Sequence, residues 1–249
     1  MSELLAGKNI IVTGSSRGIG KAMIECFSKK GANLFACMRT VTDEKKEELK
    51  ALSELHGVNI IPVQFDLRDE SQQKSAVKFI RENCLRIDGL VCNAGVAHNG
   101  MLQMTSIERM REIMEINFFA QMRLIQLVSR AMIPQKAGSI VAIGSVGGIM
   151  PRVGFIAYGS SKAALMWAAS SLAQELGPFG IRVNTVAPGL TDTDMLKVRS
   201  KESIKEAISM TAEHRMAKPE EIAEATAFLL SDASSFINGQ TLRVDGGRS

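Results

Sequence analysis

Residue types that mark particular classes of protein are scarce in this 249-residue chain, which contains one Tyr, one Trp and four Cys. A structural metal site would need cysteines at ligand spacing. The four present, Cys26, Cys37, Cys84 and Cys92, lie instead within apolar strand or helix patterns. We expect them to be small core residues of a protein in a reducing compartment, and we expect no metal site.

The chain also lacks a strong charge of either sign and long apolar runs. Its 30 basic and 26 acidic residues are spread along the sequence and leave a net charge of +4. No basic block indicates nucleic acid, and no polybasic amphipathic helix or apolar run of about 18 residues indicates a membrane. The start, Met1–Leu5, has neither a cationic nor an apolar segment. We therefore expect no secretory signal and a cytoplasmic protein.

The chain does contain an alternation of short apolar segments and helical patterns, with 45% apolar residues and no linker or repeat. Strands are expected at Asn9–Thr13, Asn33–Met38, Asn59–Phe65, Gly89–Asn93, Gly138–Gly144, Arg182–Ala187 and Thr241–Val244. Helices are expected near Ile19–Lys30, Asp43–His56, Glu70–Cys84, Ser106–Met132, Tyr158–Leu176 and Pro219–Ser231. This alternation predicts one α/β domain over residues 1–249, a doubly wound, Rossmann-type parallel sheet of about seven strands with helices on both faces.

The single tyrosine, Tyr158, lies thirteen residues after Ser145 and four residues before Lys162. Residues at positions i and i+4 of a helix share one face. An ammonium group one turn from a phenol favours the phenolate and lowers its pKa, which suits proton transfer in carbonyl and alcohol chemistry. In the alternative interpretation, Tyr158 caps a core helix and Lys162 is a nearby surface residue.

A glycine-rich segment directly follows the first expected strand. It runs from Gly14 through Gly18 to Gly20, where a helical pattern begins. Strand, glycine turn and helix start form an arrangement in which backbone N–H groups bind phosphate, and a Cβ atom would obstruct the approach of a pyrophosphate. Glycines also occur in ordinary loops, but three of them directly after a strand favour dinucleotide binding.

These features belong to a longer series of short motifs. The series is Thr13-Gly14, Gly18-Ile19-Gly20, Asn93-Ala94-Gly95, Asn117, Ser145, Tyr158, Lys162 and Pro188-Gly189. In this order it resembles the short-chain dehydrogenase/reductase family over nearly the whole chain, and it is most similar to 3-oxoacyl-[acyl-carrier-protein] reductases. The resemblance implies hydride transfer between a nicotinamide nucleotide and a carbonyl group, a substrate lid over about residues 190–215, and a homotetramer.

The resemblance also assigns catalytic roles to four residues. Tyr158 would donate a proton to the carbonyl oxygen, Ser145 would polarise that carbonyl, and Lys162 would lower the pKa of Tyr158 and hold the nicotinamide ribose. Asn117 would support a water-linked proton relay to Lys162. Because Asn is unfavourable within a helix, a helix bend or an interhelix hydrogen bond is an alternative role for Asn117 that can coexist with the relay.

Cofactor preference can be inferred from the end of the second strand. An acidic residue there would bind the ribose hydroxyls of NAD, but this chain has Met38 followed by Arg39, and Arg17 lies in the glycine turn. The missing acid and the two guanidinium groups predict NADP(H) rather than NAD(H). The expected cofactor-binding residues are Gly14, Ser16, Arg17, Gly18, Ile19, Gly20, Arg39, Asp66, Leu67, Asn93, Ala94, Gly95, Tyr158, Lys162, Pro188, Gly189 and Thr191.

The sequence leaves the substrate open. An acidic acyl carrier protein would need basic residues around the entrance of the site, for which Arg123, Arg130, Lys136 and Arg152 are candidates. Against that partner, Gln174 stands where carrier-protein reductases often have Arg. A 3-oxoacyl thioester is one hypothesis and a secondary alcohol, sugar or steroid-like substrate is another. A non-catalytic NADPH-binding regulatory protein is the third.

The histidines and methionines add little. His56, His98 and His214 show no partner pattern and are expected in surface or loop positions. Most methionines are expected to fill the core, whereas Met195 and Met210 flank the expected lid.

Overall fold

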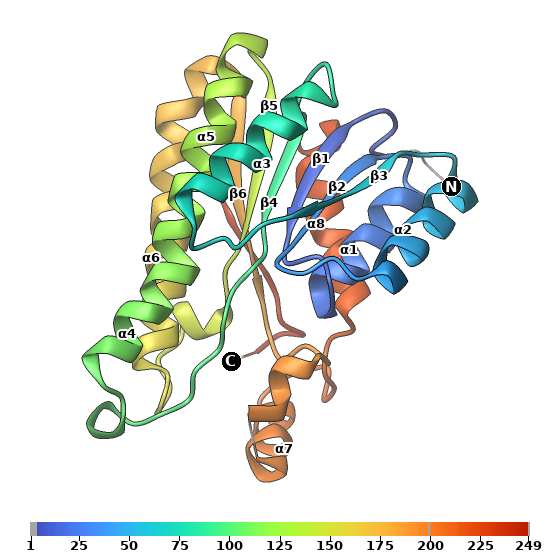
Figure 1. Ribbon diagram of the computed structural model, residues 1–249. Coiled ribbons are helices and arrows are strands. Elements are labelled where there is room, and N and C mark those ends of the chain that lie inside the picture. Colours follow the sequence, from blue (N-terminus) through green and yellow to red (C-terminus); the bar gives the residue numbers. More distant parts are fainter. Residues whose placement is uncertain (1–3, 199, 249) are drawn as a thin grey trace.

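The computed structural model describes residues 4–198 and 200–248 and shows one parallel sheet between two layers of helices (Figure 1). The sheet has the strand order β3-β2-β1-β4-β5-β6-β7. Its strands are β1 (Asn9–Thr13), β2 (Asn33–Met38), β3 (Ile60–Gln64), β4 (Gly89–Cys92), β5 (Gly138–Ile143), β6 (Ile181–Pro188) and β7 (Thr241–Val244). The order reverses direction between β1 and β4, so the doubly wound prediction is confirmed. Residues 1–3, 199 and 249 of the expected domain, and with them part of the expected lid, lie outside the described residues.

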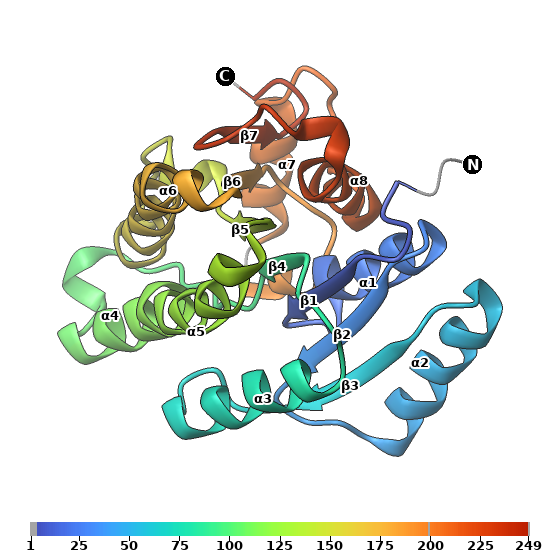
Figure 2. The same cartoon turned by 90° about the horizontal axis from the view of Figure 1, so that it is seen from above.

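Helices on both faces explain why the central strands are apolar throughout. Helices α3 (Glu70–Glu82), α5 (Ala120–Gln135) and α6 (Ile156–Leu176) cover one face, and α1 (Gly18–Lys29), α2 (Asp43–His56) and α8 (Pro219–Leu230) cover the other (Figure 2). Each layer of helices packs against its face of the sheet and forms a hydrophobic core. One core includes Leu90 and Ile140, and the other includes Val12 and Val141. Strands buried on both faces need apolar residues at successive positions, not at alternate ones.

The expected elements agree with the structure closely, with two differences in the helices. The three strands β1, β2 and β7 have the expected bounds, β4 and β5 each end one residue earlier than expected, and β3 and β6 differ by one residue at both ends. The single helix expected over Ser106–Met132 is instead α4 (Ile107–Met114), a π-helical turn at Glu115–Phe119, and α5. A further helix, α7 (Lys201–Ser209), lies within the expected lid and was not predicted.

The carboxyl ends of the strands gather at one edge of the sheet, as they must in a parallel arrangement. There α7 protrudes below the sheet, near the chain's carboxyl end (Figure 1). Open α/β sheets bind ligands at this edge, where the strand order reverses. Within the described ranges, no helix combines the length and apolar character needed to cross a membrane.

Candidate active site

The tyrosine and serine singled out in the sequence meet at the carboxyl end of β5. Tyr158 lies in the first turn of α6, and Ser145 directly follows β5 at the start of a short turn. The two side chains line one cleft, and the Ser145 hydroxyl acts on the phenol in the direction that lowers its pKa. The Ser145 hydroxyl also accepts a hydrogen bond from the backbone N–H of Gly147 at 3.0 Å, which fixes its orientation. Tyr158 is itself held edge-on against the ring of Phe155, with ring centroids 5.7 Å apart.

Lys162 lies one helical turn after Tyr158 and is almost fully buried, with 4% of its surface exposed. Its ammonium group donates a hydrogen bond to the backbone carbonyl of Ile143 at 2.7 Å. Burial lowers the pKa of Lys162 to about 8, because charging the amine away from water is unfavourable. The amine therefore titrates close to neutral pH, where it can both release and accept a proton.

The expectation that Lys162 lowers the pKa of Tyr158 is not met in the protein alone. Burial raises the pKa of the Tyr158 phenol, and the Ser145 hydroxyl only partly counteracts this. The physical reason is that Lys162 directs its ammonium group at the Ile143 carbonyl, while the phenol loses its hydration. Ser145, not Lys162, is thus the residue that favours the phenolate here.

Asn117 is fully buried in the π-helical turn between α4 and α5. Its Nδ2 donates to Ser161 Oγ at 3.0 Å and to the Val96 carbonyl at 3.0 Å, and its Oδ1 accepts from the Val96 N–H at 2.9 Å. Ser161 Oγ in turn donates to the Tyr158 carbonyl at 2.7 Å. Of the two structural roles considered for Asn117, the interhelix hydrogen bond is present, and at the place of the expected bend the helix makes a π-helical turn. Asn117 therefore ties the helix that carries Tyr158 to the loop after β4.

The glycine turn is built for close approach to the loop that follows β4. A Cβ atom on Gly14 would lie 2.9 Å from the Ala94 Cα, and one on Gly20 would collide with the Gly14 carbonyl oxygen. Asn93 Nδ2 donates to the Thr13 and Gly14 carbonyls at 2.9 and 3.2 Å, closing the two segments together. Only glycine fits at Gly14 and Gly20, as the fingerprint predicted.

Thr13, the last residue of β1, organises the same junction and was not singled out as a site residue. Its hydroxyl donates to the Val91 carbonyl at 3.1 Å and accepts from the N–H groups of Asn93 and Ala94 at 3.0 and 3.1 Å. A threonine before a glycine turn is the signal in the sequence that would have identified it. One hydroxyl thereby connects β1, β4 and the loop after β4.

The amino end of α1 meets the requirements of a phosphate site. Its N-cap residue, Arg17, has extended backbone and makes no side-chain hydrogen bond to the first turn. Helix N-termini leave backbone N–H groups without partners in the helix and carry a partial positive charge, so an anion is stabilised there. Arg17 and Ser16 are exposed beside this turn. The residues present therefore fit the pyrophosphate of a dinucleotide.

The residues expected at the adenosine end lie after β2 and β3. Met38 is buried at the end of β2, and the exposed Arg39 follows it. The carboxylate of Asp66 is held by Arg68 at 2.6 Å, and this pairing lowers the pKa of Asp66. Leu67 packs beside the core. A free acidic group is thus absent at the end of β2, and the carboxylate after β3 already has a cationic partner.

A cleft at this edge brings many of the expected residues together. Those that line it are Ile19, Asn93, Gly95, Ser145, Tyr158, Lys162, Pro188, Gly189 and Thr191. Residues that do not line it are Gly14, Ser16, Arg17, Gly18, Gly20, Arg39, Asp66, Leu67, Ala94 and Asn117. The first group surrounds the reacting end, and most of the second belongs to the glycine turn and to the adenosine end, with Asn117 buried behind the cleft.

The comparisons with known proteins agree with this geometry. Residues 14–249 match a family model described as enoyl-(acyl carrier protein) reductase. The 3-oxoacyl-[acyl-carrier-protein] reductase FabG of Escherichia coli (strain K12) is 36% identical over 241 residues, which cover 97% of this chain and 97% of the relative. The chain belongs to the short-chain dehydrogenase/reductase family.

Two solved structures extend the similarity to other substrates of this oxidoreductase fold. A 7α-hydroxysteroid dehydrogenase complexed with NADH and 7-oxo glycochenodeoxycholic acid is 30% identical with a TM-score of 0.91, over 99% of this chain and 96% of that one. A putative NAD(P)-dependent gluconate 5-dehydrogenase from Beutenbergia cavernae with bound NADP is also 30% identical with a TM-score of 0.91, over 99% and 98% of the two chains. The short-chain dehydrogenase/reductase assignment is therefore confirmed by sequence and by fold.

Several residues of the short-chain dehydrogenase/reductase cleft were not predicted as site residues. His98 was expected on the surface or in a loop, and it does lie in a loop, but its ring also forms part of the cleft wall. His98 Nε2 lies 3.1 Å from Thr105 Oγ1. The remaining unpredicted wall residues are Val96, Ala97, Asn99, Ile143, Gly144, Val146, Gly147, Met150, Phe155, Leu190, Leu196 and Arg248. Met195, expected at the lid, lines the cleft as well.

The basic residues expected to ring the entrance do not do so as a group. Arg123 is paired with Glu115, and Lys136 ends α5 at the opposite edge of the sheet, just before β5 begins. Arg130, in the same half of α5 as Lys136, does not line the cleft. Arg152 alone of the four lines the cleft. The reason is that α5 runs away from the carboxyl edge, which carries its later residues to the far side.

Proposed function

We propose that this short-chain dehydrogenase/reductase reduces a ketone with NADPH. The observation that supports this best is that Tyr158, Ser145 and Lys162 line one cleft, with Ser145 acting on the Tyr158 phenol. A carbonyl oxygen placed against the two hydroxyls would receive two hydrogen bonds where negative charge develops. The bound nicotinamide would supply the hydride to the carbonyl carbon.

The side chains divide the remaining work of the reaction. Tyr158 passes its proton to the carbonyl oxygen, and Ser145 holds that oxygen and favours the resulting phenolate. The raised pKa of the buried phenol keeps it protonated before the reaction, as a proton donor requires. Lys162, with a pKa of about 8, is suited to return a proton to Tyr158 through solvent in the cleft. Asn117 acts as a positioning residue through Ser161.

A preference for NADP(H) over NAD(H) is part of the proposal. Arg17 and Arg39 are exposed beside the glycine turn and the end of β2, and no carboxylate follows β2 directly. Guanidinium groups suit a 2′-phosphate, which they bind in bidentate fashion. The kcat/KM ratio for NADPH over NADH tests this point. We expect Arg39→Gln to reduce the ratio at least tenfold, and an unchanged ratio would refute the role of Arg39.

The substrate class is suggested by the relatives but differs among them. The Escherichia coli relative is named for 3-oxoacyl-[acyl-carrier-protein], which makes a short 3-oxoacyl thioester the first substrate to test. The two solved structures are named for a hydroxysteroid and for gluconate, which favours a secondary alcohol or its ketone as the second candidate. Of the basic residues expected around the entrance of the cleft, only Arg152 lines it, so few of them could contact an acidic acyl carrier protein.

The deciding experiment follows the absorbance of NADPH with a panel of 3-oxoacyl thioesters, cyclic ketones and hydroxy-acid ketones. We expect turnover with at least one class, and higher rates with NADPH than with NADH. Binding of NADPH without turnover of any ketone, or of any alcohol with NADP⁺, would refute the reductase and favour a regulatory protein. Faster oxidation of alcohols with NAD⁺ would refute the proposed direction.

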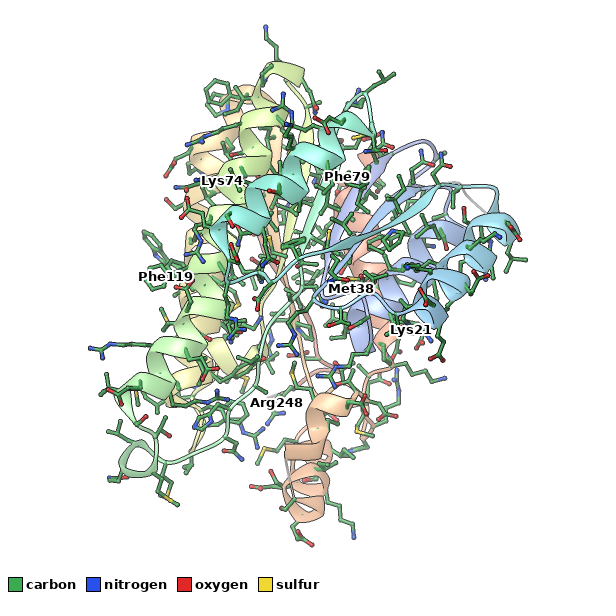
Figure 3. All side chains as sticks on the ribbon, viewed as in Figure 1. Lys21, Met38, Lys74, Phe79, Phe119 and Arg248 are labelled. Atoms are coloured by element: carbon green, nitrogen blue, oxygen red, sulfur yellow. The ribbon has the colours of Figure 1, made fainter. Side chains whose placement is uncertain are left out.

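A homotetramer is also part of the proposal. Trp167 on α6 is 76% exposed and Phe119 beside α5 is 50% exposed, and Phe119 points outward from its layer (Figure 3). The edge strand β7 is mostly exposed along its length. Exposed aromatic side chains and an open strand edge are features of surfaces that pair with another copy. Sedimentation of the protein with Trp167→Lys should show smaller assemblies than wild type, and an unchanged assembly would refute this interface.

A further inference from the structure

The carboxyl-terminal tail places a cationic side chain inside the cleft of the proposed reductase. Arg248 lines the cleft and is only 6% exposed (Figure 3 shows it beside α7). Gly246 and Gly247 both have positive φ, at 63° and 70°, and turn the chain back after β7. Few residue types other than glycine adopt this conformation without strain, so the reversal is built into the sequence.

The backbone of this tail is anchored at several points. Arg248 forms an antiparallel bridge with Thr211, and the Glu213 N–H donates to the Gly246 carbonyl at 3.1 Å. The Arg243 guanidinium donates to the Arg248 carbonyl and also holds the Asp245 carboxylate, at 2.6 Å. The tail is therefore joined to the segment after α7 and to β7. These bonds fix the backbone at Arg248 against its neighbours.

The guanidinium of Arg248 has poor compensation within the protein. Its one hydrogen-bond contact among the described residues is Nη2 to the Met210 sulfur at 3.6 Å, and a thioether is a weak, neutral acceptor. Among the described residues no carboxylate lies within ion-pair distance of Arg248, and the neighbouring Asp245 is paired with Arg243. Burial, followed by the repulsion of Arg152, lowers the pKa of Arg248, and the attraction of the Asp245 and Glu206 carboxylates only partly offsets this. A buried cation with only these contacts is costly and is stabilised when an anion binds.

The charges around the cleft have one sign. Its described lining includes Arg152, Lys162 and Arg248 but no Asp or Glu. Arg152 lies over the Phe155 ring, 5.5 Å from its centroid, and forms no ion pair with a described carboxylate. Apart from these groups, the wall near the lid is apolar, with Met150, Leu190, Met195 and Leu196 among its members. The cleft thus combines Tyr158 and Ser145 with an apolar wall and two arginines among its lining residues.

We infer that the substrate carries a carboxylate, which Arg248 and Arg152 bind while the ketone lies against Tyr158 and Ser145. This inference rests on the proposed reductase and specifies its substrate as an oxo acid of moderate size with an apolar middle section. The planar guanidinium matches a carboxylate by two parallel hydrogen bonds, and a desolvated site strengthens them. A neutral ester or thioester of the same carbon chain would leave both arginines without a counter-charge.

The test compares straight-chain oxo acids with their methyl esters, with the ketone placed at carbons 3 to 6, in NADPH-dependent turnover. We expect kcat/KM for the best acid to exceed that of its ester at least tenfold. Arg248→Gln should lower kcat/KM for the acid by about ten- to a hundredfold and leave the ester within about threefold, as expected for one charge-assisted interaction. Arg248→Lys should retain part of the preference. Arg130→Gln, on the exposed part of α5, is the matched control and should change neither.

Binding provides a second measurement, which separates this inference from the reductase itself. Calorimetry with the full-length protein and NADP⁺ should show the oxo acid binding to wild type, and binding at least tenfold weaker to Arg248→Gln. If no ketone is turned over but this Arg248-dependent binding is found, the reductase fails and the anion site stands. Three results would overturn the inference: an equal kcat/KM of wild type for acid and ester, an equal decrease in kcat/KM for both in Arg248→Gln, or an affinity for the oxo acid that is the same in wild type and Arg248→Gln.

Discussion

Replacement of Thr13 by valine tests how the cofactor loop is held in place. Valine has nearly the shape of threonine, so Thr13→Val removes the hydroxyl without creating a large cavity. The loss affects three hydrogen bonds, of 3.0 to 3.1 Å, that join β1 to β4 and to the loop at Asn93 and Ala94. Thr13→Ser keeps the hydroxyl and is the matched control.

The expected magnitude follows from the two N–H groups that lose their acceptor. An unsatisfied buried donor costs about 1–3 kcal/mol. The bonds from Asn93 and Ala94 are only part-buried, so water can replace some of the loss. We therefore expect Thr13→Val to lower the free energy of unfolding by about 2 kcal/mol, and Thr13→Ser by less than about 1 kcal/mol.

The same substitution should weaken cofactor binding, because Asn93 and Gly95 line the cleft beside the glycine turn. Urea unfolding followed by fluorescence of Trp167 measures stability, and NADPH titration measures affinity. A Thr13→Val protein as stable as wild type, with unchanged NADPH affinity, would refute the view that this hydroxyl holds the loop. Equal losses in Thr13→Ser and Thr13→Val would refute it as well, because the hydroxyl would then not be the cause.

Two further expectations follow from the site. Gly20→Ala should weaken NADPH binding at least a hundredfold, since the new Cβ collides with the Gly14 carbonyl, whereas Gly177→Ala at the end of α6 should not, and comparable affinities for the two variants would contradict the account of the turn. Below pH 8, the free energy of unfolding of Lys162→Met should exceed that of wild type by about 3 kcal/mol, because the variant no longer buries a charge. Because wild type is relieved of its buried charge between pH 8 and the ordinary lysine pKa of 10.5, that advantage should shrink as the pH rises through this window, and an advantage independent of pH would show that the Lys162 amine is not shifted.

The strands and the glycine turn were predictable because their signals are local. Apolar runs such as Asn9–Thr13 mark strands buried on both faces, and the glycines after that run leave little alternative to a tight turn. The order of the short motifs also resembled one family, and that resemblance predicted Ser145, Tyr158 and Lys162 as catalytic residues. The structure brings these three residues into one cleft, and their catalytic roles remain proposals.

Other features depend on contacts that a sequence pattern does not contain. Asn117 signals an irregularity in Glu115–Phe119, but a single turn of five residues is too short for its side-chain period to distinguish a π-helical turn from an α-helix. The pKa of Tyr158 depends on how deeply the ring is buried and on where the Lys162 amine points. Arg248 lies at the cleft because Gly246 and Gly247 reverse the chain after β7. Since Arg248 is far along the sequence from Tyr158 and Ser145, the sequence did not indicate that it lines the same cleft.

The most direct test of the central claim is to compare wild type with Tyr158→Phe in NADPH oxidation with the ketone that wild type uses best. The account predicts a loss in kcat of about a thousandfold, the size expected for removal of a positioned general acid, with the dissociation constant of NADPH within about threefold of wild type. A variant that retains kcat within tenfold of wild type while binding NADPH normally would contradict the assignment of Tyr158 as the proton donor, and with it the proposed mechanism.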